Sequence, residues 1–414
     1  MRFVRVTIYF LTIILFFSGL LESIGIPLVL IKFLSEFCVV LGFVFLLLSR
    51  VRITVRPNLV ILTSLYFGAT MISVYTTHGS IIDGFKYLRY MVLIVLLLIQ
   101  FNTLFRERID IKIYMKFMYN IFIIQIVYAF LEIVFIGVEE EVVGTIFLNG
   151  GEYATILPLI ILAFSAFYYM TEGGRRHLII GLLSITIGFA SAKRGILFFF
   201  PASVVALFLL DRFQRWGFYA TLLPGLVVIG LVLPVIGILA RYNSGIASSS
   251  DGAFSSFVAA ANYSKEYSSG INYRGYTIGR SSTSMNVLLH SLVLNKNTFF
   301  GYGPDILLGN SGDFEPYKID YGIVGWSKSI LSIGWFGLVT EILLLREIFT
   351  TLKRMVFGQT ATSKFRIFYW LILGQAFLIY FSYSVLLTAS LYLVLPYFII
   401  VAGIANFNYS KTHG

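Results

Sequence analysis

Residues 218–240 read FYATLLPGLVVIGLVLPVIGILA and contain no charged side chain. This stretch exceeds the roughly 20 residues that a helix needs to cross the hydrocarbon core of a membrane, and residues 153–170, YATILPLIILAFSAFYYM, come close to that length. Within lipid, only helices and closed barrels satisfy every backbone hydrogen bond. Barrel strands alternate apolar and polar residues over about ten positions, whereas these blocks are apolar throughout, so the sequence predicts an all-α fold.

Similar apolar blocks recur along the whole chain. Of its 414 residues, 58% are hydrophobic and 12% are charged, against about 25% charged in soluble domains, which excludes a soluble fold. The blocks lie near residues 6–22, 26–48, 58–75, 85–102, 115–137, 153–170, 178–192, 195–211, 217–240, 323–345, 366–384 and 386–405. The sequence therefore predicts a polytopic transmembrane helical bundle of about 12 spans. Residues 1–21 lack a small-x-small cleavage site, so we expect them to form a retained first helix and not a signal peptide.

The net charge of +11 is distributed unevenly between alternate loops. If the N-terminus is cytoplasmic, the loops on that side hold more than half of the 31 basic residues, namely Arg2, Arg5, Arg50, Arg52, Arg56, Arg106, Arg108, Lys112, Lys116, Arg175, Arg176, Arg212, Arg215, Arg346, Lys353, Arg354, Lys364, Arg366 and Lys411. Short loops rich in Lys and Arg stay on the cytoplasmic side. We therefore expect both termini in the cytoplasm. The positive net charge is explained by this topology, and no nucleic-acid partner is expected.

One outer segment is long enough to be a small domain. Residues 241–322 separate nine predicted spans, in residues 1–240, from three further spans in residues 323–414. The last span is followed by a predicted cytoplasmic tail. The first part, 243–273, is rich in Ser, Gly, Asn and Tyr and predicts irregular structure. Residues 284–294 are apolar at helical spacing and predict a short helix on the membrane surface or over a cavity.

Three local patterns place glycine and polar residues on the predicted outer side. They are GTIFLNGGEYA at 144–154, with Asn149 and Glu152; SAKRG at 191–195; and a segment from Arg280 through His290 to FFGYGP at 299–304, followed by GWFG at 334–337. In this order and on this topology, they resemble the superfamily of bacterial O-antigen ligases and polymerases. The resemblance covers 144–345, about half of the chain. Two departures are Ala192-Lys193, where the family has Ser, and Asn297-Thr298, where it has Asn-Pro.

The resemblance implies a glycosyltransferase in the bacterial cytoplasmic membrane that uses glycans linked through pyrophosphate to a polyprenyl lipid. Ligases of the superfamily have a His just before the tenth helix, and no His occurs near Ile323, so the likeness favours a polymerase. A polymerase would join lipid-linked repeat units at the outer face, with a chain-length regulator and a flippase as partners. A ligase that transfers the glycan to another acceptor is the alternative.

Positive charge on the predicted outer side needs an explanation, because loops rich in Lys and Arg normally stay on the cytoplasmic side. A departing pyrophosphate gains charge, and guanidinium groups grip phosphate oxygens with two parallel hydrogen bonds. The catalytic candidates are Arg194, Arg280 and Arg274, with Lys193 nearby and Lys86 and Arg89 at the outer start of the fourth span. The structural alternatives are an interfacial anchor for Arg194, solvated loop charges for Arg274 and Arg280, and flanks of the span for Lys86 and Arg89.

The choice of a general base stays open in the sequence. His290 has a suitable intrinsic pKa but also fits a helix face packed among leucines. The acidic candidates are Asp305, Asp313, Glu315 and Asp320, of which Asp305 and Asp320 are the best placed. The further substrate-binding candidates are Asn149, Glu152, Gly301, Tyr302, Gly303 and Asp305, with the tyrosine available to stack on sugar.

No cofactor or metal is expected. Glu139–Glu141 form a solvated acidic loop more readily than a metal site, and Cys38 is the single cysteine. The Gly301–Pro304 turn lacks the lysine of a nucleotide loop. A transporter of lipid-linked oligosaccharide is the alternative from another functional class, but the sequence shows neither related halves nor charges paired deep in the spans. Lys32 and Glu36 come nearest, and they are spaced to pair with each other.

Overall fold

The computed structural model describes just over half of the chain. The described residues are 2–49, 51–53, 55–106, 112–135, 144–146, 151–190, 271–273, 276–278, 280–292, 296–304, 324–357, 369, 373–376, 387, 391 and 394–401. The predicted blocks at 195–211 and 217–240 and most of the long outer segment lie outside these ranges.

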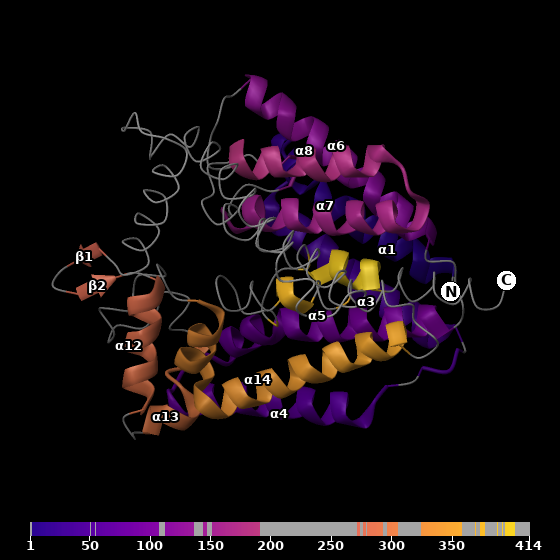
Figure 1. Cartoon of the computed structure of the whole chain (residues 1–414). Helices are drawn as coiled ribbons and strands as arrows, with labels where there is room; N and C mark the ends of the chain where they lie inside the picture. Colours follow the sequence, from indigo (N-terminus) through magenta and orange to yellow (C-terminus); the bar gives the residue numbers. More distant parts are fainter. Residues whose placement is uncertain are drawn as a thin grey trace, which may run out of the picture.

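The described chain is almost entirely helical (Figure 1). Its helices are α1 (Arg2–Phe16), α2 (Ser18–Ser23), α3 (Leu28–Leu48), α4 (Pro57–Thr76), α5 (Ile81–Arg106), α6 (Lys112–Phe135), α7 (Gly151–Glu172), α8 (Arg175–Ala190), α12 (Arg280–Leu292), α13 (Lys296–Phe300) and α14 (Gly325–Phe357). A two-stranded antiparallel hairpin, β1 (Ile271–Tyr273) and β2 (Tyr276–Ile278), is the only β-structure among the described residues. The eight predicted apolar blocks that fall in the described ranges all form helices.

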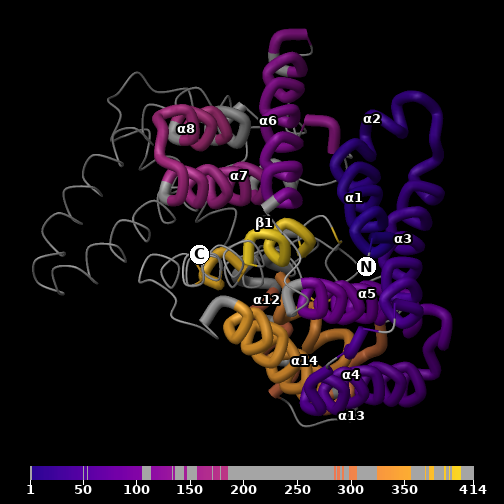
Figure 2. Tube along the Cα trace, turned by 90° about the vertical axis from the view of Figure 1, so that its right-hand side faces the viewer, coloured from indigo at the N-terminus to yellow at the C-terminus, as the bar shows by residue number. Residues whose placement is uncertain are grey.

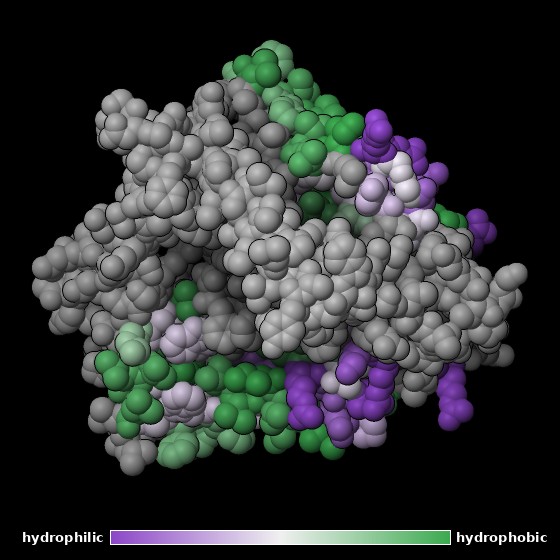
Figure 3. Space-filling model, in the orientation of Figure 1, coloured by the Kyte–Doolittle hydropathy of each residue, from purple (hydrophilic) through white to green (hydrophobic). Residues whose placement is uncertain are grey.

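Four of these helices are long and apolar enough to cross a membrane, which indicates a membrane protein. They are Leu28–Leu48, Pro57–Thr76, Ile113–Glu132 and Gly325–Met355. Large apolar side chains of α3 remain exposed, among them Val29, Phe33 and Leu48. On the face shown in Figure 3, apolar residues form continuous patches, and hydrophilic residues gather on the side toward which α14 runs in Figure 1. Such a surface suits lipid around the helices and water at their ends.

Contacts between α4 and α14 fix their relative direction. Arg56, just before α4, forms an ion pair of 2.5 Å with Glu347 of α14. Near the other end of α4, the hydroxyl of Ser73 donates a hydrogen bond of 2.7 Å to the carbonyl oxygen of Ser332. The two helices therefore run antiparallel, and α5 packs beside them (Figure 2). The start of α14 lies at the end of the molecule where α4 leads into α5.

A second group of helices consists of α6, α7 and α8. The hydroxyl of Tyr119 in α6 lies 2.8 Å from Nδ1 of His177, and the ring of Tyr168 stacks on the same imidazole. Burial and the neighbouring Arg176 guanidinium lower the pKa of His177. This contact joins the turn between α7 and α8 to the first half of α6, as expected if these segments share one side of the membrane.

Three sequence expectations need correction. The first block is not one helix, because it breaks at Phe17 between α1 and α2. The segment predicted to be irregular ends in strand β1. The tenth block extends to Phe357 and is interrupted at Gly334, whose φ of 68° and ψ of −171° are not helical.

Candidate functional site

The glycine turn at residues 301–303 docks on the break in α14. The amide of Tyr302 donates to the carbonyl oxygen of Leu331 at 2.8 Å, and the amide of Gly303 donates to that of Ser332 at 3.1 Å. A helix that ends leaves its last carbonyl groups without intrahelical donors. The turn therefore caps the first half of α14 from a separate part of the chain.

Only glycine fits at the centre of this contact. Gly301 has a φ of 75°, and a Cβ there would lie 2.6 Å from the backbone nitrogen of Gly334. A Cβ on Gly334 would in turn overlap the carbonyl oxygen of Phe299. Since the atoms in the way belong to the backbone, no side chain can move aside. The FFGYGP and GWFG patterns are thus two halves of one interlocked backbone contact.

Helix α4 completes the frame around the turn. The Ser73 hydroxyl donates to the Ser332 carbonyl, which also accepts the amide of Gly303. Gly303 has a φ of 94°, and a Cβ there would lie 2.7 Å from the hydroxyl oxygen of Thr77. The end of α4 therefore sits directly against the glycine turn.

Helix α12 packs across the first half of α14. The hydroxyls of Ser284 and Ser327 lie 3.1 Å apart, and the indole nitrogen of Trp335 donates to the carbonyl oxygen of Ser291 at 3.3 Å. Val287 is buried in a cluster with apolar residues of α14, and Tyr302 packs against that cluster. Tyr302 is thus half-buried among apolar side chains, which leaves only part of its ring for a sugar.

The first sequence pattern also docks on a helix break. Because the helix is interrupted at Phe17, the carbonyl oxygen of Phe16 accepts from the Thr145 hydroxyl at 2.7 Å and from the Gln125 amide at 2.8 Å. The amide of Gly19 donates to the carbonyl oxygen of Thr145 at 2.9 Å. The turn of residues 144–146 therefore caps the break between α1 and α2.

Side chains of α6 hold this turn from the other side. The amide of Thr145 donates to Oε1 of Gln125 at 2.7 Å, and the amide of Gly144 donates to Oε2 of Glu132 at 3.0 Å. Sequence reasoning missed Gln125 and Glu132, although polar residues inside an apolar block are a visible signal. The turn lies a few residues before α7, whose second residue is Glu152.

The two candidate cations of α5 are held by carboxylates. Nζ of Lys86 lies 2.6 Å from Asp83, and Nε of Arg89 lies 3.2 Å from Glu36 of α3. The Arg89 guanidinium also lies over the ring of Tyr90, 4.7 Å from its centroid. Glu36 thus forms its ion pair across helices with Arg89. The expected partner within its own helix, Lys32, is not its main contact. Lys86 is more than half exposed and keeps surface open for an anion.

The predicted site residues fall into three groups. The structure describes Lys86, Arg89, Gly301, Tyr302 and Gly303 with their contacts, and it brings the three turn residues together with Gly334. It describes only the backbone of three others. Glu152 is the second residue of α7, Arg280 is the first residue of α12, and His290 lies in the last turn of α12. Lys193, Arg194, Arg274, Asn149, Asp305 and Asp320 lie outside the described residues, as do Asp313 and Glu315.

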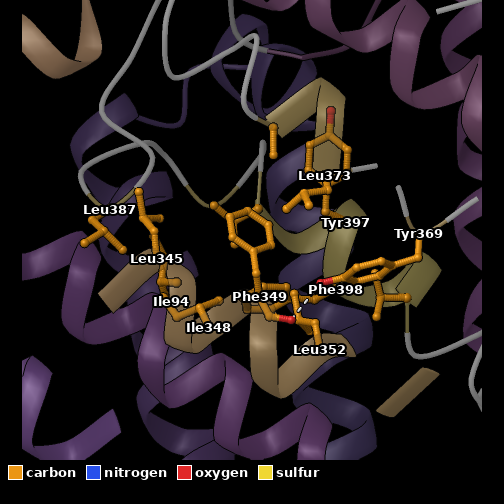
Figure 4. A pocket seen from close by; sticks show the side chains of 13 residues that line it. Ile94, Leu345, Ile348, Phe349, Leu352, Tyr369, Leu373, Leu387, Tyr397 and Phe398 are labelled. Atoms are coloured by element: carbon orange, nitrogen blue, oxygen red, sulfur yellow. Dashed lines mark hydrogen bonds between the residues drawn. The ribbon is translucent and has the colours of Figure 1, made fainter. Parts of the chain in front are cut away.

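An apolar pocket lies in the other half of α14, beyond the break (Figure 4). It is partly open to the surface and is lined by Ile94, Leu345, Ile348, Phe349, Leu352, Tyr369, Leu373, Ala376, Leu387, Val394, Tyr397, Phe398 and Val401. The Tyr369 hydroxyl donates to the carbonyl oxygen of Phe349 at 2.7 Å, and that of Tyr397 to Gln375 at 3.4 Å. Because both hydroxyls are engaged, the described lining of the pocket offers no group that would grip phosphate.

Glu341 is a buried acid that sequence reasoning missed. It lies in α14, seven residues after Gly334, and its side chain is fully buried. A charged residue inside an apolar block was the available signal, since ionisable side chains within spans mark functional sites by default. Within the described ranges, no group of three or more His, Cys, Asp and Glu residues could hold a metal ion.

Comparison of the chain with models of protein families, with curated proteins and with solved structures finds no match.

Proposed function

We propose that this chain is a membrane glycosyltransferase of the polysaccharide polymerase type. It transfers a glycan from polyprenyl pyrophosphate to a lipid-linked repeat unit at the outer face of the bacterial cytoplasmic membrane. The acceptor hydroxyl attacks the anomeric carbon, the bond to pyrophosphate breaks, and the acceptor proton leaves with a base. Arg194 and Arg280, with Arg274 and Lys193, stabilise the departing pyrophosphate.

The observation that carries this proposal is the interlock between Gly301 and Gly334. Both glycines belong to patterns that suggested the O-antigen ligase and polymerase superfamily. A contact of backbone on backbone explains why both patterns need glycine. It also supports a rigid base for the last turn of α12, where Trp335 beside Gly334 bonds the carbonyl oxygen of Ser291, while Arg280 lies at the other end of that helix.

A partly exposed positive charge, paired with Asp83, follows α4 along the chain. The turn lies at the end of α4, and α5 begins a few residues further along the chain with the half-exposed side chain of Lys86. Preplaced positive charge in a partly dehydrated site lowers a barrier on which phosphate charge develops by several kcal/mol. This supports Lys86 as a secondary phosphate contact, whereas Arg89 acts mainly to position α5 against α3.

Two other functions remain alternatives. A ligase would use the same donor with a different acceptor. A transporter of lipid-linked oligosaccharide is favoured by one specific observation. Glu341 is buried within the broken helix α14 and forms no ion pair with the described residues, and transporters bind ions at such interruptions.

One assay separates the three functions. Full-length protein, purified in lipid nanodiscs, receives a single lipid-linked repeat unit, and the products are separated on a gel. A ladder of bands identifies a polymerase, one new band that requires an added acceptor identifies a ligase, and unchanged glycan supports transport. Arg280→Ala and Arg194→Ala are expected to abolish the ladder, with Arg354→Ala, in the last turn of α14, as the matched control. Full activity of both variants would exclude the proposed mechanism.

A further inference from the structure

Glu341 has no partner for its charge in the described part of the chain. Its side chain is 0% exposed, and neither carboxylate oxygen has a hydrogen-bond partner. None of the ion pairs among the described residues includes it. Since it lies within the candidate span Gly325–Met355, a bare carboxylate there would be costly. Something outside the described groups must neutralise it.

The break in α14 brings a second oxygen toward this carboxylate. In a continuous helix, Ser329 and Glu341 would lie about 18 Å apart along the axis, from a rise of about 1.5 Å per residue. The interruption at Gly334 folds the two halves toward each other, and Ser329 comes to lie beside Glu341. The two halves of α14 are visibly at an angle in Figure 1.

Two serine hydroxyls of the first half of α14 bond to the backbone of their own helix. The hydroxyl of Ser329 donates to the carbonyl oxygen of Gly325 at 3.3 Å, and that of Ser332 donates to the carbonyl oxygen of Lys328 at 2.8 Å. A hydroxyl has one proton to donate and two lone pairs to accept with. The single hydroxyl proton of Ser329 can reach one carboxylate oxygen of Glu341 at most, so the second oxygen stays without a donor among the described residues.

Tyrosines of the neighbouring helices complete the surroundings. From α5, Tyr87 interacts with Ser329, Ser332 and Glu341. From α4, the hydroxyl of Tyr66 lies 3.5 Å from that of Tyr87. The nearest charged residues along α14, Arg346 and Glu347, lie more than a helical turn further on, and Glu347 is paired with Arg56. No Lys, Arg or His in the described ranges forms an ion pair with Glu341.

We propose that Glu341, with the hydroxyl oxygens of Ser329 and Tyr87, forms a binding site for a monovalent cation, either H⁺ or Na⁺. Hard cations bind sets of carboxylate and hydroxyl oxygens. Interrupted helices in membranes supply such sites. The bound cation ties the second half of α14 to the first, and so stabilises the break on which the glycine turn docks. This site does not depend on the proposed glycan transfer.

The first test measures the reactivity of the carboxyl group. Dicyclohexylcarbodiimide modifies protonated carboxyl groups within membranes, and mass spectrometry of peptides from the full-length protein quantifies the product at Glu341. If the site takes H⁺, labelling falls as pH rises and Na⁺ has no effect. If it takes Na⁺, labelling at constant pH falls with NaCl but not with KCl, roughly tenfold at a concentration ten times the Kd. Labelling that is the same at every pH and Na⁺ concentration would overturn the proposal.

A stability measurement provides the second test. A ligand that binds only the folded state raises the unfolding temperature with its concentration. The unfolding temperature of the wild type should therefore rise with Na⁺ or with falling pH, and Glu341→Gln should lose that dependence. Glu347→Gln, in which the paired acid of the same helix is neutralised, is the matched control and should retain it. If Glu341→Gln responds like the wild type, no cation binds at Glu341.

Discussion

The hydroxyl of Ser73 donates a 2.7 Å hydrogen bond to the carbonyl oxygen of Ser332, which lies 259 residues further along the chain. Ser332 precedes the break in α14, so this bond ties α4 to the break itself. The same carbonyl accepts the amide of Gly303. One oxygen thus joins α4, α14 and the glycine turn.

Ser73→Ala should lower stability modestly, because the Ser332 carbonyl keeps its bond from Gly303. Hydrogen bonds between helices in membranes contribute about 0.6 kcal/mol on average and at most about 1.7 kcal/mol. We expect a loss in this range in reversible unfolding of the purified protein. Thr63→Ala, which removes only a bond to Leu59 of its own helix, is the control and should cost less. Equal costs would show that the bond between α4 and α14 adds nothing.

Gly301→Ala should prevent the glycine turn from docking. The substitution adds strain at positive φ, about 1–2 kcal/mol, and a contact with backbone that cannot move. Gly25→Ala is the matched control, because Gly25 also has a positive φ, 93°, but nothing lies within 4 Å of the added Cβ. Glycan transfer and stability should fall sharply in Gly301→Ala, whereas Gly25→Ala should show only the strain. Similar unfolding temperatures for the two variants would contradict the interlock.

Thr145→Val should loosen the turn that caps the break between α1 and α2. Valine keeps the shape of threonine but removes the hydroxyl that bonds Phe16 and Gln125. We expect a loss of about 1–2 kcal/mol, since the Gln125 amide loses an acceptor while the Phe16 carbonyl keeps that amide as a donor. Thr12→Val is the control, as its buried hydroxyl bonds only within its own helix. A larger loss for Thr12→Val would argue against a capping role of Thr145.

The ion pair between Arg56 and Glu347 should couple strongly. Their side chains are 21% and 10% exposed, whereas those of Arg176 and Glu172 are 72% and 51% exposed. A double-mutant cycle with Arg56→Gln and Glu347→Gln should give a coupling energy of roughly 1–3 kcal/mol. The corresponding cycle for Arg176 and Glu172 should give about 0.5 kcal/mol or less. If the two energies were equal, burial would not strengthen the first pair.

The sequence predicted local features better than long-range partners. Apolar blocks predicted helices because lipid requires continuous apolar surface, and glycine patterns predicted tight turns because glycine adopts positive φ without strain. The partner of each turn was not predictable, since the contact of Gly301 with Gly334 depends on how distant helices pack. For the same reason, the sequence alone shows Gln125 and Glu341 only as single polar residues within apolar blocks. Only their neighbours in space show that Gln125 is satisfied and that Glu341 forms no ion pair with the described residues.

The sidedness of the chain can be tested with serine-to-cysteine substitutions. Ser23 follows the break after α1 and Ser80 lies between α4 and α5, both on the predicted outer side, whereas Ser49 ends α3 on the predicted cytoplasmic side. Each is introduced singly after the one native cysteine, Cys38, is replaced by alanine. The change from hydroxyl to thiol is small, so the three variants should fold alike.

A maleimide that cannot cross membranes should label Ser23→Cys and Ser80→Cys in intact cells. It should label Ser49→Cys only after permeabilisation, because the basic loop at Arg50, Arg52 and Arg56 stays cytoplasmic. Since Thr77 contacts Gly303, the glycine turn shares the side of Ser80. The opposite labelling pattern would place that turn, and the start of α12, in the cytoplasm. A lipid-linked glycan at the outer face could then not reach Arg280, and the proposed transfer would have to be abandoned.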